Sequence, residues 1–168
     1  MTAVVRRALA SDAAPIARIY NQGIADRIAT FETDPRTAEE IAGLLERRAD
    51  RWPTVVVERD GDVIAWAGAS EYRSRACYAG VADFSVYVAR EHRGAGAGRV
   101  AMEALIAACE ERGIWKLVSR VFPENEASRR LLARVGFREV GTYRRHAMLD
   151  GVWRDTVIVE RLIGEAAR

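Results

Sequence analysis

The chain has 168 residues, of which 49% are hydrophobic and 30% charged, with a formal net charge of +2 at pH 7. This is the composition of a globular protein, and it argues against a disordered chain and against a nucleic-acid binder that works mainly through phosphate contacts. The length fits one domain, residues 1–168 with a core at about 4–162. No run of residues reaches transmembrane length and the N-terminus has no apolar signal core, so we expect a cytoplasmic protein without a membrane partner.

The first third of the chain predicts a short strand and two helices. The strand covers residues 4–8, and Ser11 or Asp12 is expected to cap the first helix, whose apolar side chains recur at helical spacing. Thr37 and Glu40 form a capping box at the start of the second helix. The first third of the chain is therefore expected to contribute one strand and two helices to the fold.

The segment 25–35 between those helices is polar but contains Ile28 and Phe31. An apolar pair in a polar loop indicates contact with a ligand or with another subunit. Docking of the loop onto its own core explains the pair equally well.

Strands follow in the middle of the chain. Residues 54–58 and 63–70 are joined through Asp60-Gly61, a strong hairpin signal, and a polar loop at 71–75 leads to a central strand at 81–89. The two cysteines match no metal or disulfide spacing, and Cys109 lies on the apolar stripe of a predicted helix, where we expect it in the core. We therefore expect no metal.

The last third adds a helix that stops at Gly113, a strand, a short helix that Asn125 caps, and a final hairpin across Asp150-Gly151. The strand is expected at 115–122, and the two strands of the final hairpin at 137–146 and 153–162. This order of elements predicts an α/β fold of the α+β type. Its centre is a mixed, mostly antiparallel sheet of about seven strands with four helices.

A glycine-rich turn lies between the central strand and the third helix. Gly94, Gly96 and Gly98 leave backbone amides uncovered where the helix begins, and Arg93 and Arg99 bracket them. The amides and the helix dipole favour an anion such as a phosphate. The alternative is a surface turn without a ligand.

Two well-known phosphate motifs fit this turn poorly. A Walker loop needs Lys and Ser or Thr after its last glycine, where this chain has Arg99-Val100. Gly96-x-Gly98-x-x-Ala101 satisfies a dinucleotide fingerprint, but residues 89–93 separate it from its strand and it does not open a βαβ unit.

The motif Arg93-x-x-Gly96-x-Gly98 resembles the coenzyme A signature of the GNAT superfamily of N-acetyltransferases, as do Asn125-x-x-Ser128 and Gly136-Phe137 further on. Within it the chain looks most like phosphinothricin, methionine sulfoximine and arsinothricin acetyltransferases. The stretches that carry this likeness are 19–24, 29–33, 72–75, 83–88 and 150–155. Residues 29–33 and 72–75 favour the arsinothricin branch.

The resemblance implies the GNAT fold, acetyl-CoA as cosubstrate, and a homodimer. By the same resemblance, the residues that bind the coenzyme are Val86, Tyr87, Val88, Arg93, Gly94, Ala95, Gly96, Ala97, Gly98, Arg99, Asn125 and Ser128. The backbone of the first three is expected to hold the pantetheine arm and the thioester, and the glycine turn the pyrophosphate. Asn125 is explained equally well as a helix cap.

Asp83 is the candidate catalytic base. An amine must be neutral to attack a thioester, and in the resembled enzymes a glutamate at this position takes the proton. Aspartate is shorter by about 1.5 Å, one bond length, which a bridging water can make up. The alternative is a strand-edge residue without a chemical role.

The leaving thiolate has no evident acid. Many members of the resembled family carry Tyr or His at the position of Leu132, which cannot transfer a proton. Either the thiolate leaves unaided, or Tyr87, Tyr143 or His146 protonates it.

The expected substrate is a small, glutamate-like amino acid. Arg73 and Arg75 point the same way if their segment is extended, which suits an oxygen-rich acid; a solvated loop is the alternative. The other residues expected at the substrate are Tyr20, Ile28, Thr30, Phe31 and Tyr72. The alternative functions are acetylation of protein N-termini or polyamines, and a non-catalytic acetyl-CoA-binding module.

Overall fold

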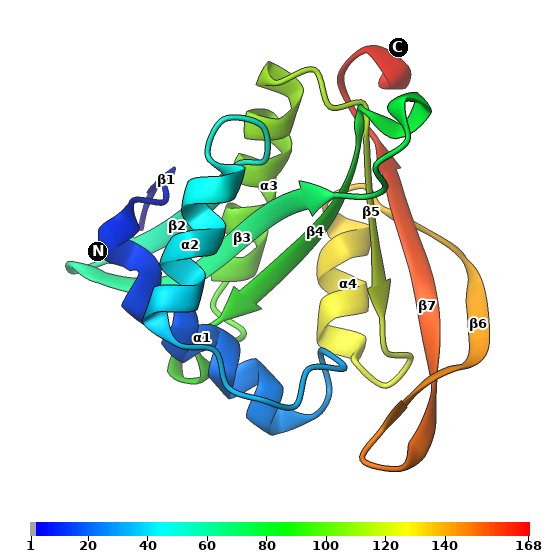
Figure 1. Ribbon diagram of the computed structural model, residues 1–168, viewed down its shortest axis with the longest axis horizontal. Helices are drawn as coiled ribbons and strands as arrows, with labels where there is room; N and C mark the ends of the chain where they lie inside the picture. The colour runs from blue at the N-terminus through cyan, green and yellow to red at the C-terminus, as the bar shows by residue number, and fades with distance from the viewer. Residues whose placement is uncertain (1–2) are drawn as a thin grey trace.

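The computed structural model describes residues 3–168 and is built on one mixed sheet with strand order β1-β2-β3-β4-β5-β7-β6 (Figure 1). The strands are β1 (Val4–Arg7), β2 (Thr54–Arg59), β3 (Asp62–Glu71), β4 (Val81–Val88), β5 (Lys116–Val121), β6 (Arg138–Leu149) and β7 (Val152–Leu162). The helices are α1 (Ala13–Asp26), α2 (Ala38–Arg48), α3 (Ala97–Glu111) and α4 (Glu126–Arg134). The predicted mixed α/β fold is confirmed.

Local signals in the sequence set most boundaries of these elements. Asp60 and Gly61 turn the β2–β3 hairpin with φ of 54° and 88°, both in the left-handed region that such a tight turn requires. The amide of Glu40 donates to Thr37 Oγ1 at 3.1 Å, and the amide of Thr37 donates to Glu40 Oε2 at 2.8 Å, which confirms the capping box of α2. Asn125 caps α4 as predicted, because its Oδ1 accepts from the amide of Ser128 at 3.2 Å.

Helices cover both faces of the sheet (Figure 1). On one face, α3 and α4 bury the main core, in which Met102, Leu105 and Leu132 are almost inaccessible. On the other face, α1 and α2 pack Ile16 and Ile19 over the sheet. Cys109 is buried in the main core, as predicted, and burial raises the pKa of its thiol to about 12. Within residues 3–168 no helix combines the length and the apolarity that crossing a bilayer requires.

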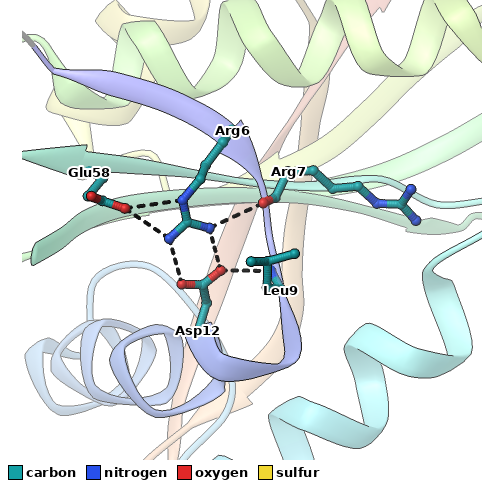
Figure 2. A network of polar contacts seen from close by, with 5 residues as sticks. All are labelled: Arg6, Arg7, Leu9, Asp12 and Glu58. Carbon is teal, nitrogen blue, oxygen red and sulfur yellow. Dashed lines mark hydrogen bonds and ion pairs between the residues drawn. The ribbon is translucent and has the colours of Figure 1, made fainter. Parts of the chain in front are cut away.

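Asp12 is the N-cap residue of α1, one of the two predicted positions. Its side chain makes no capping hydrogen bond to the helix, however, and lies buried beside β1 instead. It accepts from Arg6 at 2.7 and 2.9 Å and from the amide of Leu9 at 2.7 Å, and Arg6 also donates to Glu58 of β2 at 2.9 Å (Figure 2). The carboxylate therefore ties the start of α1 to the edge of the sheet, a more favourable use of a buried charge than one exposed cap.

The parallel pair β4–β5 positions the site. Its register covers only Val81 to Asp83, opposite Lys116 to Val118, and beyond Asp83 the strands separate (Figure 1). At the branch point the hydroxyl of Ser119 donates to the carbonyl of Phe84 at 3.0 Å, replacing a ladder bond. The separation leaves the rest of β4 with an open edge facing α4. Backbone groups on such an edge are free to bind a ligand in extended form.

Candidate active site

A cleft of about 1150 Å³ opens where β4 and β5 diverge, and α4, the glycine turn and the loop after α1 form its walls. Most of the predicted site residues line it. These are Tyr20, Ile28, Thr30, Phe31, Asp83, Val86, Tyr87, Val88, Arg93, Gly94, Gly96, Gly98, Arg99, Asn125 and Ser128. Ala95, Ala97, Tyr72, Arg73 and Arg75 are not among the lining residues.

The glycine turn at one end of the cleft is built for close approach. Gly94 and Gly96 have φ of 79° and 87°, a conformation that only glycine adopts without strain. Gly98 is glycine for a different reason: an added Cβ would lie 3.0 Å from the Leu131 side chain and 3.3 Å from Val88. Since α3 begins at Ala97, the amides of its first turn have no helical partner, and Gly96, Gly98 and Arg99 line the cleft at this point. This end of the cleft suits a pyrophosphate.

Asp26 holds the glycine turn in place, a role that the sequence did not reveal. Its carboxylate binds Arg93 at 2.7 Å and Arg90 at 2.6 Å, so that the last turn of α1 is joined to the segment before the glycines. Burial opposes the charge on Asp26, but these hydrogen bonds outweigh it and lower the pKa of the carboxyl. Arg93 thus supports the turn, while Arg99 pairs with Glu103 at 2.7 Å on the first turns of α3.

Asp83 lies at the branch point of β4 and β5, where its side chain is 30% exposed. Burial raises the pKa of this carboxyl, and the charges of Arg120 and then Arg73 oppose the rise. Arg120 Nη1 is 3.8 Å from Asp83 Oδ1, too far for a hydrogen bond. A carboxylate with a raised pKa is a stronger base, which is the property that amine deprotonation requires.

Aromatic side chains form the wall on the α1 side. Phe31 packs edge-on against Phe122 with ring centroids 4.9 Å apart, and Tyr20 packs against Tyr87 in the same way at 4.9 Å. Both explanations of the apolar loop pair therefore apply to Phe31, which docks on its own chain and lines the cleft. Ile28 is 46% exposed at the rim.

The loop at 71–75, which carries Arg73 and Arg75, does not line the cleft. Tyr72 packs edge-on against Tyr78 at 5.5 Å, and the Arg73 guanidinium sits 5.2 Å from the centre of the Tyr72 ring. Arg73 and Arg75 are both exposed to solvent. Only the charge of Arg73 reaches the site, through its effect on Asp83.

Of the three candidate acids for the leaving thiolate, only Tyr87 lines the cleft. Burial raises its pKa further above the ordinary value of tyrosine, so it holds its proton more firmly than a thiol does. Tyr143 and His146 stack on each other at 4.6 Å on the exposed strand β6. Leu132 is buried in the core at 2% exposure.

Sequence reasoning did not place Arg120 of β5, Phe122 just after β5 or Thr156 of β7 in the site, although all three line the cleft. No sequence signal singled out Arg120, because β5 also carries Lys116 and Ser119. No signal marked Thr156 either; its hydroxyl is buried and, within the described residues, has no hydrogen-bond partner.

Comparison with known proteins agrees with this geometry. Residues 17–137 match the acetyltransferase (GNAT) family. The phosphinothricin N-acetyltransferase of Streptomyces viridochromogenes is 31% identical over 94% of this chain and 86% of its own length. The L-methionine sulfoximine/L-methionine sulfone acetyltransferase of Pseudomonas aeruginosa is 27% identical over 95% and 94%.

Among solved structures, a phosphinothricin acetyltransferase from Sinorhizobium meliloti in complex with acetyl-CoA superposes with a TM-score of 0.91. It is 30% identical, and the match covers 98% of this chain and 90% of that one. The family match, the relatives and the site agree with one another. The chain belongs to the acetyltransferase (GNAT) family and is an N-acetyltransferase that uses acetyl-CoA, as the sequence predicted.

Proposed function

We propose that the protein transfers acetyl from acetyl-CoA to the α-amino group of a small, glutamate-like amino acid. The observation that carries the proposal is Asp83, a carboxylate with a raised pKa at the branch point of β4 and β5, inside the cleft. Near that point the open edge of β4 is available to a thioester arm. A base at this position can accept a proton from an amine that enters the cleft beside the aromatic wall on the α1 side.

The reaction is a direct attack in a ternary complex. The pyrophosphate binds at the start of α3, and the pantetheine arm follows the backbone of residues 86–88 toward Asp83. The amine nitrogen forms a bond with the thioester carbon while its proton passes to Asp83, directly or through a water. The C–S bond then breaks. With Leu132 buried and Tyr87 a weaker acid than a thiol, the thiolate leaves without a protonating side chain.

The substrate class follows from the relatives and from the charge of the cleft. Relatives act on phosphinothricin and on methionine sulfoximine, both small amino acids with an oxygen-rich side chain. Arg73 and Arg75 stay proposed as ligands of that side-chain group, from a loop beside the cleft whose charge already reaches Asp83. Residues 29–33 and 72–75 favour arsinothricin as a further member of the class. Resistance to such compounds is the proposed role.

Acetylation of a polyamine or a protein N-terminus is the alternative within enzymes. A polyamine calls for an acidic groove, whereas the cleft lining includes more arginines than carboxylates. A non-catalytic acetyl-CoA-binding module remains the alternative outside enzymes, motivated by Leu132 and by an aspartate where the resembled enzymes carry glutamate.

Residues 1–168 are proposed to act as one N-acetyltransferase domain, located in the cytoplasm, where acetyl-CoA is made and used. The homodimer stays a proposal as well. Its support is a group of exposed apolar side chains on the edge strand β6 and its neighbour β7: Val140, Tyr143, Met148, Val152 and Trp153. Size-exclusion chromatography with light scattering tests it, and Trp153→Arg is expected to yield a monomer.

The function is tested by following release of coenzyme A from acetyl-CoA with phosphinothricin, arsinothricin and methionine sulfoximine as acceptors. Turnover of at least one, with a kcat/KM well above that for spermidine or an N-terminal peptide, is expected. No turnover above background on all three contradicts the proposal. Asp83→Glu tests the shorter side chain: a clear rise in kcat identifies the aspartate as the less effective base.

A further inference from the structure

Arg120 is the cation that faces the proposed base. It lies on β5 with its side chain 41% exposed, and its Nη1 is 3.8 Å from Asp83 Oδ1. Across the described residues 3–168, neither the guanidinium nor the Asp83 carboxylate makes a hydrogen bond with another side chain or with the backbone. Two other arginines of the cleft, Arg93 and Arg99, are instead engaged by carboxylates at 2.7 Å.

The pair is therefore close but unsatisfied. A guanidinium offers five donors in a planar fork that matches a carboxylate, and the 3.8 Å gap leaves both partners short of their preferred contact of about 2.8 Å. Phe122 follows the end of β5 and lines the same cleft as Arg120. The Phe122 ring meets the Phe31 ring with centroids 4.9 Å apart, so the cleft that holds the cation also has an apolar wall.

We propose that Arg120 is a specificity-determining residue that binds the α-carboxylate of the acceptor while Asp83 receives its α-amino group. This inference rests on the proposed function and names its recognition element. In an α-amino acid the nitrogen and the carboxylate carbon are two bonds, about 2.5 Å, apart. Arg120 Nη1 and Asp83 Oδ1 are 3.8 Å apart. An α-carboxylate can therefore lie at hydrogen-bond distance from Arg120 while the α-amino group of the same molecule lies at hydrogen-bond distance from Asp83.

The arrangement couples recognition to catalysis. The charge of Arg120 lowers the pKa of Asp83 and so weakens the base, as does the more distant Arg73. When the acceptor's carboxylate neutralises Arg120, that opposition falls and the raised pKa of Asp83 rises further. An α-amino acid thus strengthens the base that deprotonates it. An amine without a neighbouring carboxylate does not.

The experiment compares methionine sulfone with its α-carboxamide as acceptors for wild type, Arg120→Gln and Arg120→Lys. Arg120→Gln is expected to lower kcat/KM for the acid about 30-fold, the worth of a charged hydrogen-bonded contact, and not to lower it for the amide. Arg120→Lys is expected to retain part of the preference, because lysine keeps the charge without the fork. Arg144→Gln, which removes an exposed arginine on β6, is the matched control and is expected to behave as wild type.

An Arg120→Gln enzyme that keeps the full wild-type preference for the acid overturns the inference while the proposed function stands. Absence of turnover in the wild type instead overturns the proposed function. Thermal melting of each variant separates lost recognition from lost folding.

A second readout needs no turnover. We follow titration of the Asp83 carboxyl by carbon NMR with 4-(methylsulfonyl)butanoate, a carboxylate without an amine, as the probe. The probe is expected to raise the pKa of Asp83 in the wild type and to leave it unmoved in Arg120→Gln. An equal rise in both proteins, or none in the wild type, overturns the inference.

Discussion

Two carboxylate–arginine pairs in this molecule have opposite electrostatic properties. Asp12 is 4% exposed and accepts two hydrogen bonds from Arg6 and one from the amide of Leu9 (Figure 2). The hydrogen bonds from Arg6 are the main reason that the pKa of this carboxyl is lowered. Asp83 faces Arg120 across 3.8 Å without a hydrogen bond, and burial raises its pKa. The residue types are the same, and the difference is in how many donors each carboxylate receives.

The contrast separates a structural pair from a reactive one. Hydrogen bonds to the charged form stabilise it, so the Asp12 carboxylate is a poor base and a strong tie between β1, α1 and β2. Burial without donors leaves the Asp83 charge under-solvated, so this carboxylate gains from taking a proton. The predictions below test that distinction.

Removal of the reactive carboxylate is expected to have the largest effect. Asp83→Ala is predicted to lower kcat at least 100-fold, the contribution of general base catalysis, because no other group then takes the amine proton. Steady-state kinetics measure the loss, and calorimetric titration with coenzyme A is expected to show unchanged affinity. A loss below about 10-fold assigns the proton transfer to another group or to water.

Removal of the structural carboxylate is expected to act on stability. Asp12→Ala leaves Arg6 and the amide of Leu9 without their partner, and we expect a loss of about 2–3 kcal/mol in the free energy of unfolding. Urea unfolding followed by circular dichroism measures it. Asp34→Asn, at an exposed position, is the matched control and is predicted to be neutral. Equal stability of the two variants contradicts the structural role.

The two pairs are also predicted to respond to pH in different ways. Asp83 accepts a proton only when it is ionised, so kcat/KM is expected to rise with pH through a pKa above the ordinary aspartate value. Arg120→Gln removes a charge that lowers this pKa, and it is therefore expected to move the rise in kcat/KM to higher pH. Asp12 stabilises the fold above its unfolded pKa, and this stability is lost as pH falls through its lowered folded pKa. A pH–rate profile and acid unfolding curves separate the two. An acidic limb at or below the ordinary aspartate value excludes Asp83 as the group observed.

The smallest effect is predicted for the stability of Asp83→Asn. The pKa of Asp83 is higher in the folded protein than in the unfolded chain, so the folded state binds the proton more tightly. The stability that this proton provides is lost as pH rises through the folded pKa, and the ionised carboxylate therefore lowers stability at neutral pH. The melting temperature at pH 7 is therefore expected to stay equal or to rise, opposite in sign to the loss of stability predicted for Asp12→Ala. A clear fall would mean that Asp83, too, is a structural carboxylate.

Much of the fold was predictable because its signals are local. Hairpins at Asp60-Gly61 and Asp150-Gly151, the capping box at Thr37 and the cap at Asn125 depend on a few consecutive residues, and all of them are present. Asp12 occupies the predicted N-cap position, but the partner of its side chain was not predictable. Its actual partner, Arg6, comes from the neighbouring strand, and no helix-end rule includes that residue.

The sequence by itself determined the glycine turn, because positive φ at Gly94 and Gly96 and the uncovered amides before α3 are properties of a few adjacent residues. From that turn followed the coenzyme and the family. Only the tertiary structure decided the character of Asp83, because its pKa depends on burial at the β4–β5 branch and on the charges of Arg120 and Arg73. A motif carries backbone geometry, whereas a pKa depends on every charge and every solvent path around the group.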